Sequence, residues 1–284
     1  MSDGWQPSIT QQERIAFRRK QSRRSVLIAA VSTIVLVVVL VVALTSSPGW
    51  PRVRSTYLDL DLGWKAFPDV LRGLWLNIRI MVVCEIFVLG FGLLLASART
   101  LRGPVFFPVR AFATAYVDIF RGLPLILVIL LCGFGVPALQ LSGLTTSVLF
   151  WGCVALILTY TAYVAEVLRA GMESVHPSQR SAARSLGLSH AQTLRHVVIP
   201  QGVRRVLPAL LNDLVSLQKD SGLISLLGVV DAIQAAQIHV ARTFNYTPLV
   251  LASLLFVILT IPMTRFTDWV AKRQGASLIG GGIG

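Results

Sequence analysis

The chain has 284 residues, of which 54% are hydrophobic and only 14% are charged, with 26 Lys and Arg against 13 Asp and Glu. Soluble domains carry about 25% charged residues, so this composition excludes a disordered chain, a nucleic-acid-binding tail protein and most soluble enzymes. The formal charge of +13 would favour a polyanionic partner in a soluble protein, but here the basic residues lie between long apolar runs. The composition therefore predicts a membrane protein whose positive charge reports its topology.

The first predicted membrane span is Val26–Leu44, which follows a basic stretch over Arg14–Arg24. A cleaved signal peptide is the alternative. The apolar region of a signal peptide is usually about 7–15 residues long, whereas this run is longer and has no Ala-x-Ala sequence before Ser46. We therefore expect a basic tail over residues 1–25 and an uncleaved N-terminal span over residues 26–45.

Five further apolar segments approach the length of about 20 residues that a helix needs to cross a bilayer. They are Leu74–Ala98, Phe112–Leu131, Ser147–Leu168, Val206–Val230 and Leu249–Val270. No internal repeat of solenoid length is present. The predicted fold class is an all-α multi-pass membrane protein with about six transmembrane helices.

Lys and Arg concentrate in alternate connections between these spans, which predicts the orientation of the chain in the membrane. Both termini are expected on the cytoplasmic side, together with the long connection before the fifth span. The segments Thr45–Gly73 and Asp231–Pro248 are expected outside. Residues 273–284, which end in a run of glycines, are expected to form a flexible tail.

The motifs of common catalytic and metal sites are absent from the sequence. There is no G-x-x-x-x-G-K-[ST] phosphate loop, no H-E-x-x-H and no G-x-S-x-G. Cys84, Cys132 and Cys153 lie in apolar runs without a C-x-x-C pair, which predicts small buried hydrophobic residues. The chain is therefore expected to carry no catalytic residue, no metal and no cofactor of its own.

The polar segment His176–Gln201 is the most informative part of the sequence. Pro177 suits the first turn of a helix over 178–186, and Gly187 suits a left-handed cap at its end. Ser189 and Gln192 form an S-x-x-Q capping box, which starts a second helix expected to end at Pro200. Two short helices with small residues could seat in a groove on another protein, and an amphipathic pair lying on the membrane surface is the alternative.

The residues of this segment resemble the EAA loop of ATP-binding-cassette importer permeases. The resemblance rests on Ser181, Ala182, Ala183, Gly187, Ile199 and Pro200. The surrounding sequence is similar to the polar amino-acid branch of that family in four further elements, which are Arg121–Leu125, Ala162–Arg169, Pro200–Gln201 and Lys219–Leu223. One departure is plain: Ser181 stands where the family has the glutamate that names the loop.

The resemblance implies a five-helix permease core over residues 66–272, to which the first span is an addition. It implies that the loop 176–201 couples to a separate ATPase subunit that carries ATP and Mg²⁺. It further implies an extracytoplasmic solute-binding protein, a second permease subunit, identical or homologous, and a location in the plasma (inner) membrane of a prokaryote.

Ionisable residues inside membrane spans cost about 2.5–3.5 kcal/mol each to insert, and they are functional candidates for that reason. The candidates for the substrate path are Arg79, Glu85, Asp118, Arg121, Glu166, Lys219 and Asp220. Asp118 and Arg121 are spaced to pair on one helix, and Gly122 and Pro124 predict a kink directly after them. The alternative is that these charges pair with one another to hold the helices together.

Arg79 and Glu85 fall in none of the shared motifs, so we hypothesise that one of them contacts the transported solute. The leading function is the permease subunit of an ATP-driven importer for polar or charged amino acids. A second hypothesis is an ion-coupled secondary transporter with cation sites at Glu85 and Asp118, but no inverted repeat supports it. An intramembrane enzyme comes third and lacks a nucleophile motif.

Overall fold

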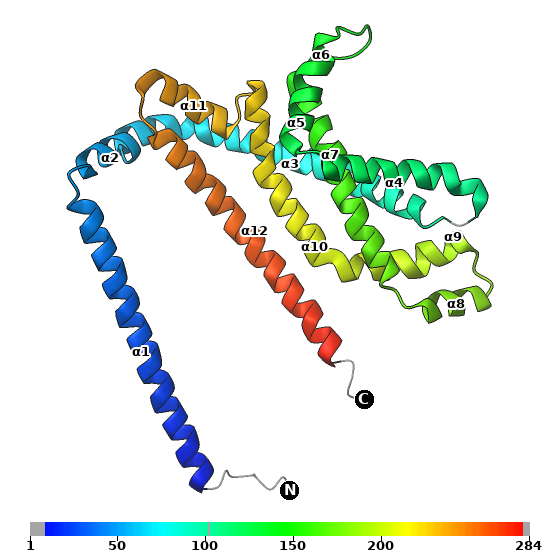
Figure 1. Ribbon diagram of the computed structural model, residues 1–284, viewed down its shortest axis with the longest axis horizontal. Helices are drawn as coiled ribbons and strands as arrows, with labels where there is room; N and C mark the ends of the chain where they lie inside the picture. Colours follow the sequence, from blue (N-terminus) through cyan, green and yellow to red (C-terminus); the bar gives the residue numbers. More distant parts are fainter. Residues whose placement is uncertain (1–8, 102, 281–284) are drawn as a thin grey trace. The chain divides into compact units, whose positions relative to one another are not determined.

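The computed structural model describes residues 9–101 and 103–280, and it describes the side chains of residues 10–11, 25–101 and 103–274 (Figure 1). These residues form helices and connections, with no strand among them. The predicted all-α class is therefore confirmed. The chain divides into two compact units, Met1–Thr56 and Tyr57–Gly284, which are described separately.

The first unit consists mainly of one long helix, α1, over Ile9–Thr45. No Gly or Pro interrupts this stretch, so the basic residues expected in a tail continue the helix of the apolar run. Residues 1–8 of the expected tail lie outside the described residues. A short helix, α2 (Trp50–Tyr57), follows in the segment expected to be an outer connection.

The second unit contains three long helices that pack together, α3 (Leu60–Arg99), α7 (Val148–Glu173) and α10 (Ile199–Asp220). The long helix α12 (Thr247–Gly280) packs against α3 and α10. The shorter helices are α4 (Phe107–Gly122), α5 (Leu125–Leu130), α6 (Val136–Ala138), α8 (Pro177–Ser185), α9 (His190–Thr193) and α11 (Ala232–Thr243). The end of the expected flexible tail, residues 281–284, lies outside the described residues.

Helix α7 occupies the middle of this unit. Half of its most apolar window is buried (50%), compared with 6% for α12. Leu156 and Val164 of α7 pack in one apolar core with Cys84 and Val88 of α3 and Leu217 of α10. The three cysteines are free thiols; Cys84 is fully buried, as predicted, whereas Cys132 and Cys153 are only partly buried. A central α7 means that side chains on it can reach several other helices at once.

The third predicted span is bent where the sequence predicts a kink. Helices α4 and α5 meet at 104° across Leu123 and Pro124. Leu123 is extended (φ −89°, ψ 136°) because proline excludes the helical conformation for the residue before it. The predicted kink within the span Phe112–Leu131 is therefore confirmed.

By length and composition, four of the described helical segments could cross a membrane, or up to six if each bent pair counts as one span. The four are Ser25–Thr45, Trp50–Arg99, Val148–Glu173 and Thr247–Gln274. The bent pairs are Pro104–Gly122 with Leu125–Ala138 and His190–Leu227 with Ala232–Thr243. The predicted number of six is the upper end of this range.

Helix α11 is held against α3 by buried polar side chains. Asn77 of α3 donates to Asp231 Oδ2 at 3.0 Å, and its Oδ1 accepts from the backbone N–H of Ala232 at 3.1 Å. Asp231 also caps α11, since its Oδ1 accepts from the N–H of Gln234 at 2.9 Å. These bonds fix the start of α11, in a segment that the sequence predicts as an outer connection.

Candidate functional site

The two short helices predicted from the polar segment are present. Helix α8 begins at Pro177, and its end is capped by Gly187 in the left-handed conformation (φ +85°). The N–H of Gly187 donates to Arg184 O at 2.9 Å, and the N–H of Leu188 donates to Ala183 O at 3.2 Å. Only a residue without a Cβ takes this conformation at little cost, so the predicted glycine cap is confirmed.

The predicted capping box also forms, but the helix that it starts does not end at Pro200. Ser189 accepts from the N–H of Gln192 at 3.3 Å, and Gln192 accepts from the N–H of Ser189 at 2.8 Å. Helix α9 continues through a π-helical turn over Leu194–Val198 directly into α10. Pro200 lies in the first turn of α10, where its missing N–H is tolerated. The wider π-helical turn before it accommodates the proline within one continuous helix.

The residues of α8 separate into a buried and an exposed set. Ala183 is buried at 5% exposure, whereas Ser181 and Ala182 are exposed. Leu186, at the end of the helix, is 83% exposed. Ala183 therefore faces the protein, whereas Ala182 and Leu186 face away from it. We name the exposed residues Ser181, Ala182 and Leu186 the coupling surface.

Hydrogen bonds join α8 to both long helices beside it. Arg180 donates to Met172 O at the end of α7 at 2.6 Å. Gln201 of α10 donates to Gln179 Oε1 at 3.1 Å. Arg205 of α10 donates to Ser174 O, just after α7. Arg180 and Gln179 therefore tie α8 to both α7 and α10, and Arg205 ties α10 to the end of α7.

Helices α7 and α10 cross closely beside these bonds, at Gly171 and Gly202. A Cβ on Gly202 would lie 2.9 Å from the backbone nitrogen of Met172, and one on Gly171 would lie 2.7 Å from Gly202 O. The two backbones are thus in direct contact. Ile199 is half-buried and Pro200 is exposed at the start of α10.

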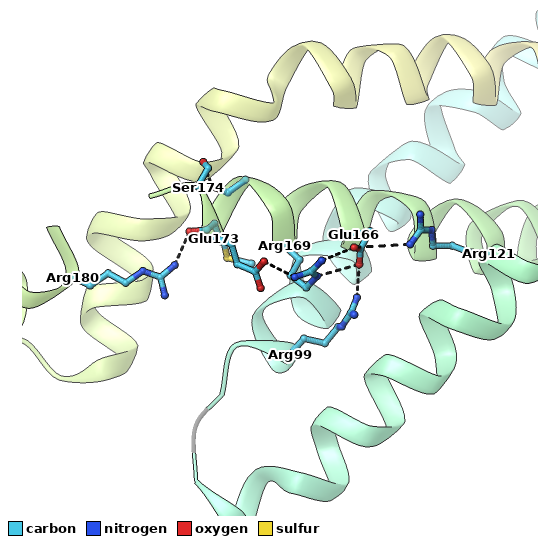
Figure 2. A network of polar contacts seen from close by, with 9 residues as sticks. Arg99, Arg121, Glu166, Arg169, Glu173, Ser174 and Arg180 are labelled. Carbon is cyan, nitrogen blue, oxygen red and sulfur yellow. Dashed lines mark hydrogen bonds and ion pairs between the residues drawn. The ribbon is translucent and has the colours of Figure 1, made fainter. Parts of the chain in front are cut away.

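A network of charges surrounds Glu166 on α7 (Figure 2). Its Oε2 accepts from Arg99 of α3 at 2.6 Å, and its Oε1 accepts from Arg169 at 2.6 Å. Arg121 of α4 lies 4.0 Å from Oε1, and Arg169 also pairs with Glu173. One carboxylate therefore holds arginines from three helices.

The structure separates the predicted pair Asp118 and Arg121. Arg121 faces Glu166, and no ion pair joins it to Asp118 among the described residues. Asp118 is exposed on α4. Arg79 is likewise exposed on α3, whereas Glu85, further along the same helix, is half-buried. The candidates of the substrate path therefore do not gather at one point.

Three acidic residues of the predicted spans have partly buried side chains on α3 and α10, namely Glu85, Asp213 and Asp220. Tyr160 of α7 donates to Asp220 Oδ2 at 2.7 Å. Lys219, although next to Asp220, is exposed and lines a groove of about 390 Å³ with Ile233 and Phe256.

Sequence reasoning missed Asp213, Arg99 and Tyr160 as parts of these arrangements. Asp213 carries a signal that could have revealed it, since it is an acidic residue inside the predicted span Val206–Val230 and has one carboxylate oxygen buried without a partner. Arg99 lies at the end of a span and Tyr160 in a plain apolar run, so neither has such a signal. The described residues contain no group of three metal-ligating side chains.

Comparison with known proteins identifies the family of the chain. Residues 88–275 match the family described as "Binding-protein-dependent transport system inner membrane component". The arginine transport system permease protein ArtQ of Bacillus subtilis is 32% identical over 217 residues, which are 76% of this chain and 97% of that protein. Such proteins are transport subunits and not enzymes, and they do not favour the secondary-transporter alternative.

Two solved structures share the fold. The crystal structure of an amino acid ABC transporter with histidines is 30% identical, has a TM-score of 0.66, and covers 74% of this chain and 95% of its own. An inward-facing structure of the MetNI methionine ABC transporter, 19% identical with a TM-score of 0.58, covers 72% and 95% of the two chains and supports the fold alone. Members of the family work in a membrane with an ATPase and a substrate-binding protein. With its matched core and its pair of short helices, the chain belongs to the family of binding-protein-dependent transport system inner membrane components, the permease subunits of ABC importers.

Proposed function

We propose that this permease forms the translocation path for polar or charged amino acids and couples it to a separate ATPase through the loop 176–201. The coupling role is supported by the exposure of the coupling surface. Leu186 is 83% exposed on a short helix whose other face is hydrogen-bonded to α7 and α10. Exposed apolar side chains on a rigid support are typical of protein interfaces.

The polar contacts along α7 support a transfer of motion from the loop 176–201 to the core. Arg180 joins α8 to the end of α7, and two turns earlier Glu166 of α7 joins the ends of α3 and α4. Closure of the ATPase subunits would move α8, and these bonds would pass the displacement to four helices. ATP and Mg²⁺, held by the ATPase, would supply the free-energy difference between the two states.

An amino-acid substrate is supported by the names of the relatives and by charges of both signs in the core. The candidates for contact with the solute are Arg79, Glu85, Asp118, Arg121, Glu166, Lys219 and Asp220. Among these, Glu85 and Asp220 are only partly exposed and have no ion pair among the described residues. An ammonium or guanidinium group could therefore approach them without displacing a protein cation.

The assembly that we propose has a second permease subunit, identical or homologous, and an external solute-binding protein. The basic loop 176–201 and both termini would face the cytoplasm of a prokaryotic cell. Segments 45–73 and 231–248 would meet the binding protein outside. In the described structure these outer segments are largely helical, as α2, the start of α3 and α11.

The test is uptake of labelled amino acids into vesicles that contain the permease with its cognate ATPase and binding protein. Leu186→Ser should lower ATP-dependent uptake about tenfold and weaken co-purification of the ATPase. A tenfold change corresponds to a loss of about 1.4 kcal/mol of binding free energy at the interface. Leu139→Ser is the matched control, because Leu139 is 65% exposed after α6, away from the coupling surface. Uptake that needs no ATPase and collapses with an ionophore would refute the proposal.

A further inference from the structure

A small cleft lies between the two short helices and the end of α3. Its polar lining consists of Thr100 after α3, Arg180 and Arg184 of α8, and His190 and Thr193 of α9, and the apolar Leu194 and Val198 complete it. The space inside is about 40 Å³. One water needs about 10–15 Å³ on this measure, so the cleft accepts a group of a few atoms and is too small for an amino acid.

Two polar atoms at this cleft are buried without a hydrogen-bond partner. One is Oγ1 of Thr193, a residue only 4% exposed, and the other is Nε2 of His190. Buried polar atoms in folded proteins are nearly always hydrogen-bonded to protein, to ordered water or to another bound group. Two unpartnered atoms beside one cavity therefore indicate that the cavity holds a hydrogen-bonding group.

The charge of the lining identifies the kind of ligand. Arg180 uses one amino group on Met172 O, which leaves most of its N–H donors available. Arg184 is exposed at the cleft, and among the described residues neither arginine pairs with a carboxylate. No acidic residue is among the described lining residues. Two guanidinium groups and two further polar side chains suit a compact oxyanion.

The position of the cleft indicates which kind of oxyanion lies near it. Thr100 directly follows Arg99, where the apolar span of α3 ends. The ends of such spans lie at the level of lipid headgroups, which carry phosphate. The geometry points to a binding site for a single phosphate group in this cleft, supplied by an anionic lipid headgroup or by free inorganic phosphate. The bound group would join α8 and α9 to the end of α3.

The test uses the purified full-length chain in a neutral detergent. It is titrated by calorimetry with inorganic phosphate and, separately, with short-chain dihexanoyl phosphatidylglycerol. Arg184→Gln should weaken binding about tenfold, whereas Arg195→Gln should change it by less than about twofold. Arg195 is the matched control because it is an exposed arginine in the same segment that does not line the cleft.

A second variant separates a binding role from a structural one. Thr193→Val removes a buried hydroxyl that has no partner, so the variant should melt at a higher temperature than the parent without ligand and bind phosphate more weakly. Saturation by the lipid alone would identify a headgroup site, and saturation by inorganic phosphate would identify a site for the free anion; either supports the proposal. No binding of either probe, or equal losses in the two arginine variants, would overturn it.

Discussion

Arg99 and Glu166 are 67 residues apart in the chain, and they meet in a 2.6 Å hydrogen bond between the end of α3 and the later part of α7. Their side chains are only 14% and 24% exposed. The same carboxylate accepts from Arg169 and faces Arg121. Ion pairs this sheltered are screened less by solvent than surface pairs, so this contact should contribute both to stability and to the relative positions of α3, α4 and α7.

Glu166→Gln should destabilise the permease by about 1–3 kcal/mol, which is less than the roughly 3–5 kcal/mol for breaking a fully buried pair because these side chains are partly exposed. The variant leaves Arg99 and Arg169 without their shared countercharge. The free energy of unfolding in mixed SDS micelles measures the loss. Glu173→Gln is the control, since Glu173 is 57% exposed and pairs with Arg169 alone; equal losses in the two variants would contradict the prediction.

A double-mutant cycle isolates the contact itself. Arg99→Gln, Glu166→Gln and the double variant should give an interaction energy of about 1 kcal/mol or more, as residues in one network usually do. Strictly additive losses would show that the 2.6 Å bond contributes nothing of its own. Uptake by the double variant then tests whether the contact is needed for coupling or only for folding.

Asn77→Leu should cost about 2–3 kcal/mol, because it keeps the approximate volume and leaves the buried Asp231 carboxylate without its amide partner. Asp69→Asn removes the negative charge from the contact between Asp69 and His239, which joins the same two helices at the surface. That variant should cost less than about 1 kcal/mol. The free energy of chemical unfolding of both variants shows whether burial of the contact determines the size of the stability loss. A larger loss for Asp69→Asn than for Asn77→Leu would contradict this explanation.

Two Gly→Ala substitutions should have opposite effects. In Gly202→Ala the new methyl group would lie 2.9 Å from Met172 N, so α7 and α10 must separate and stability should fall by about 1–3 kcal/mol. Gly90 of α3 has nothing within 4 Å of the corresponding position, and Ala there should stabilise by up to about 1 kcal/mol through helix propensity. Thermal unfolding compares the two, and a stabilising Gly202→Ala would disprove the close crossing.

Gly187→Ala should disturb the coupling loop without unfolding the core. Its φ of +85° costs alanine about 1 kcal/mol or more, whereas asparagine tolerates this region better. Hydrogen exchange over residues 177–193 should be faster in the alanine variant, with uptake reduced, and Gly187→Asn should recover part of both. An alanine variant with unchanged exchange would show that the cap is not needed to hold α8.

Much of the fold could be predicted from the sequence because its signals are local. The apolar run of Val26–Leu44, the cap at Gly187 and the capping box of Ser189 and Gln192 each depend on residues a few positions apart. Pro124 predicts the kink for the same reason, since it restricts the residue directly before it. Where the prediction failed, at Pro200, a π-helical turn replaced the expected helix end, and the local signal does not distinguish the two.

The pairing of charges could not be predicted, because it depends on which helices meet. Asp118 and Arg121 have the spacing of a pair, yet Arg121 faces Glu166 of another helix. A charged side chain on a helix can pair with a neighbour on the same helix or with side chains on other helices. The packing of the helices determines which pair forms. The sequence by itself determined the membrane class, the family and the two short helices of residues 176–201, because composition and short motifs encode them. Only the tertiary structure decided that Glu166 joins three helices and that Thr193 lines an arginine-rich cleft, because contacts between residues far apart in the chain exist only once the helices have packed.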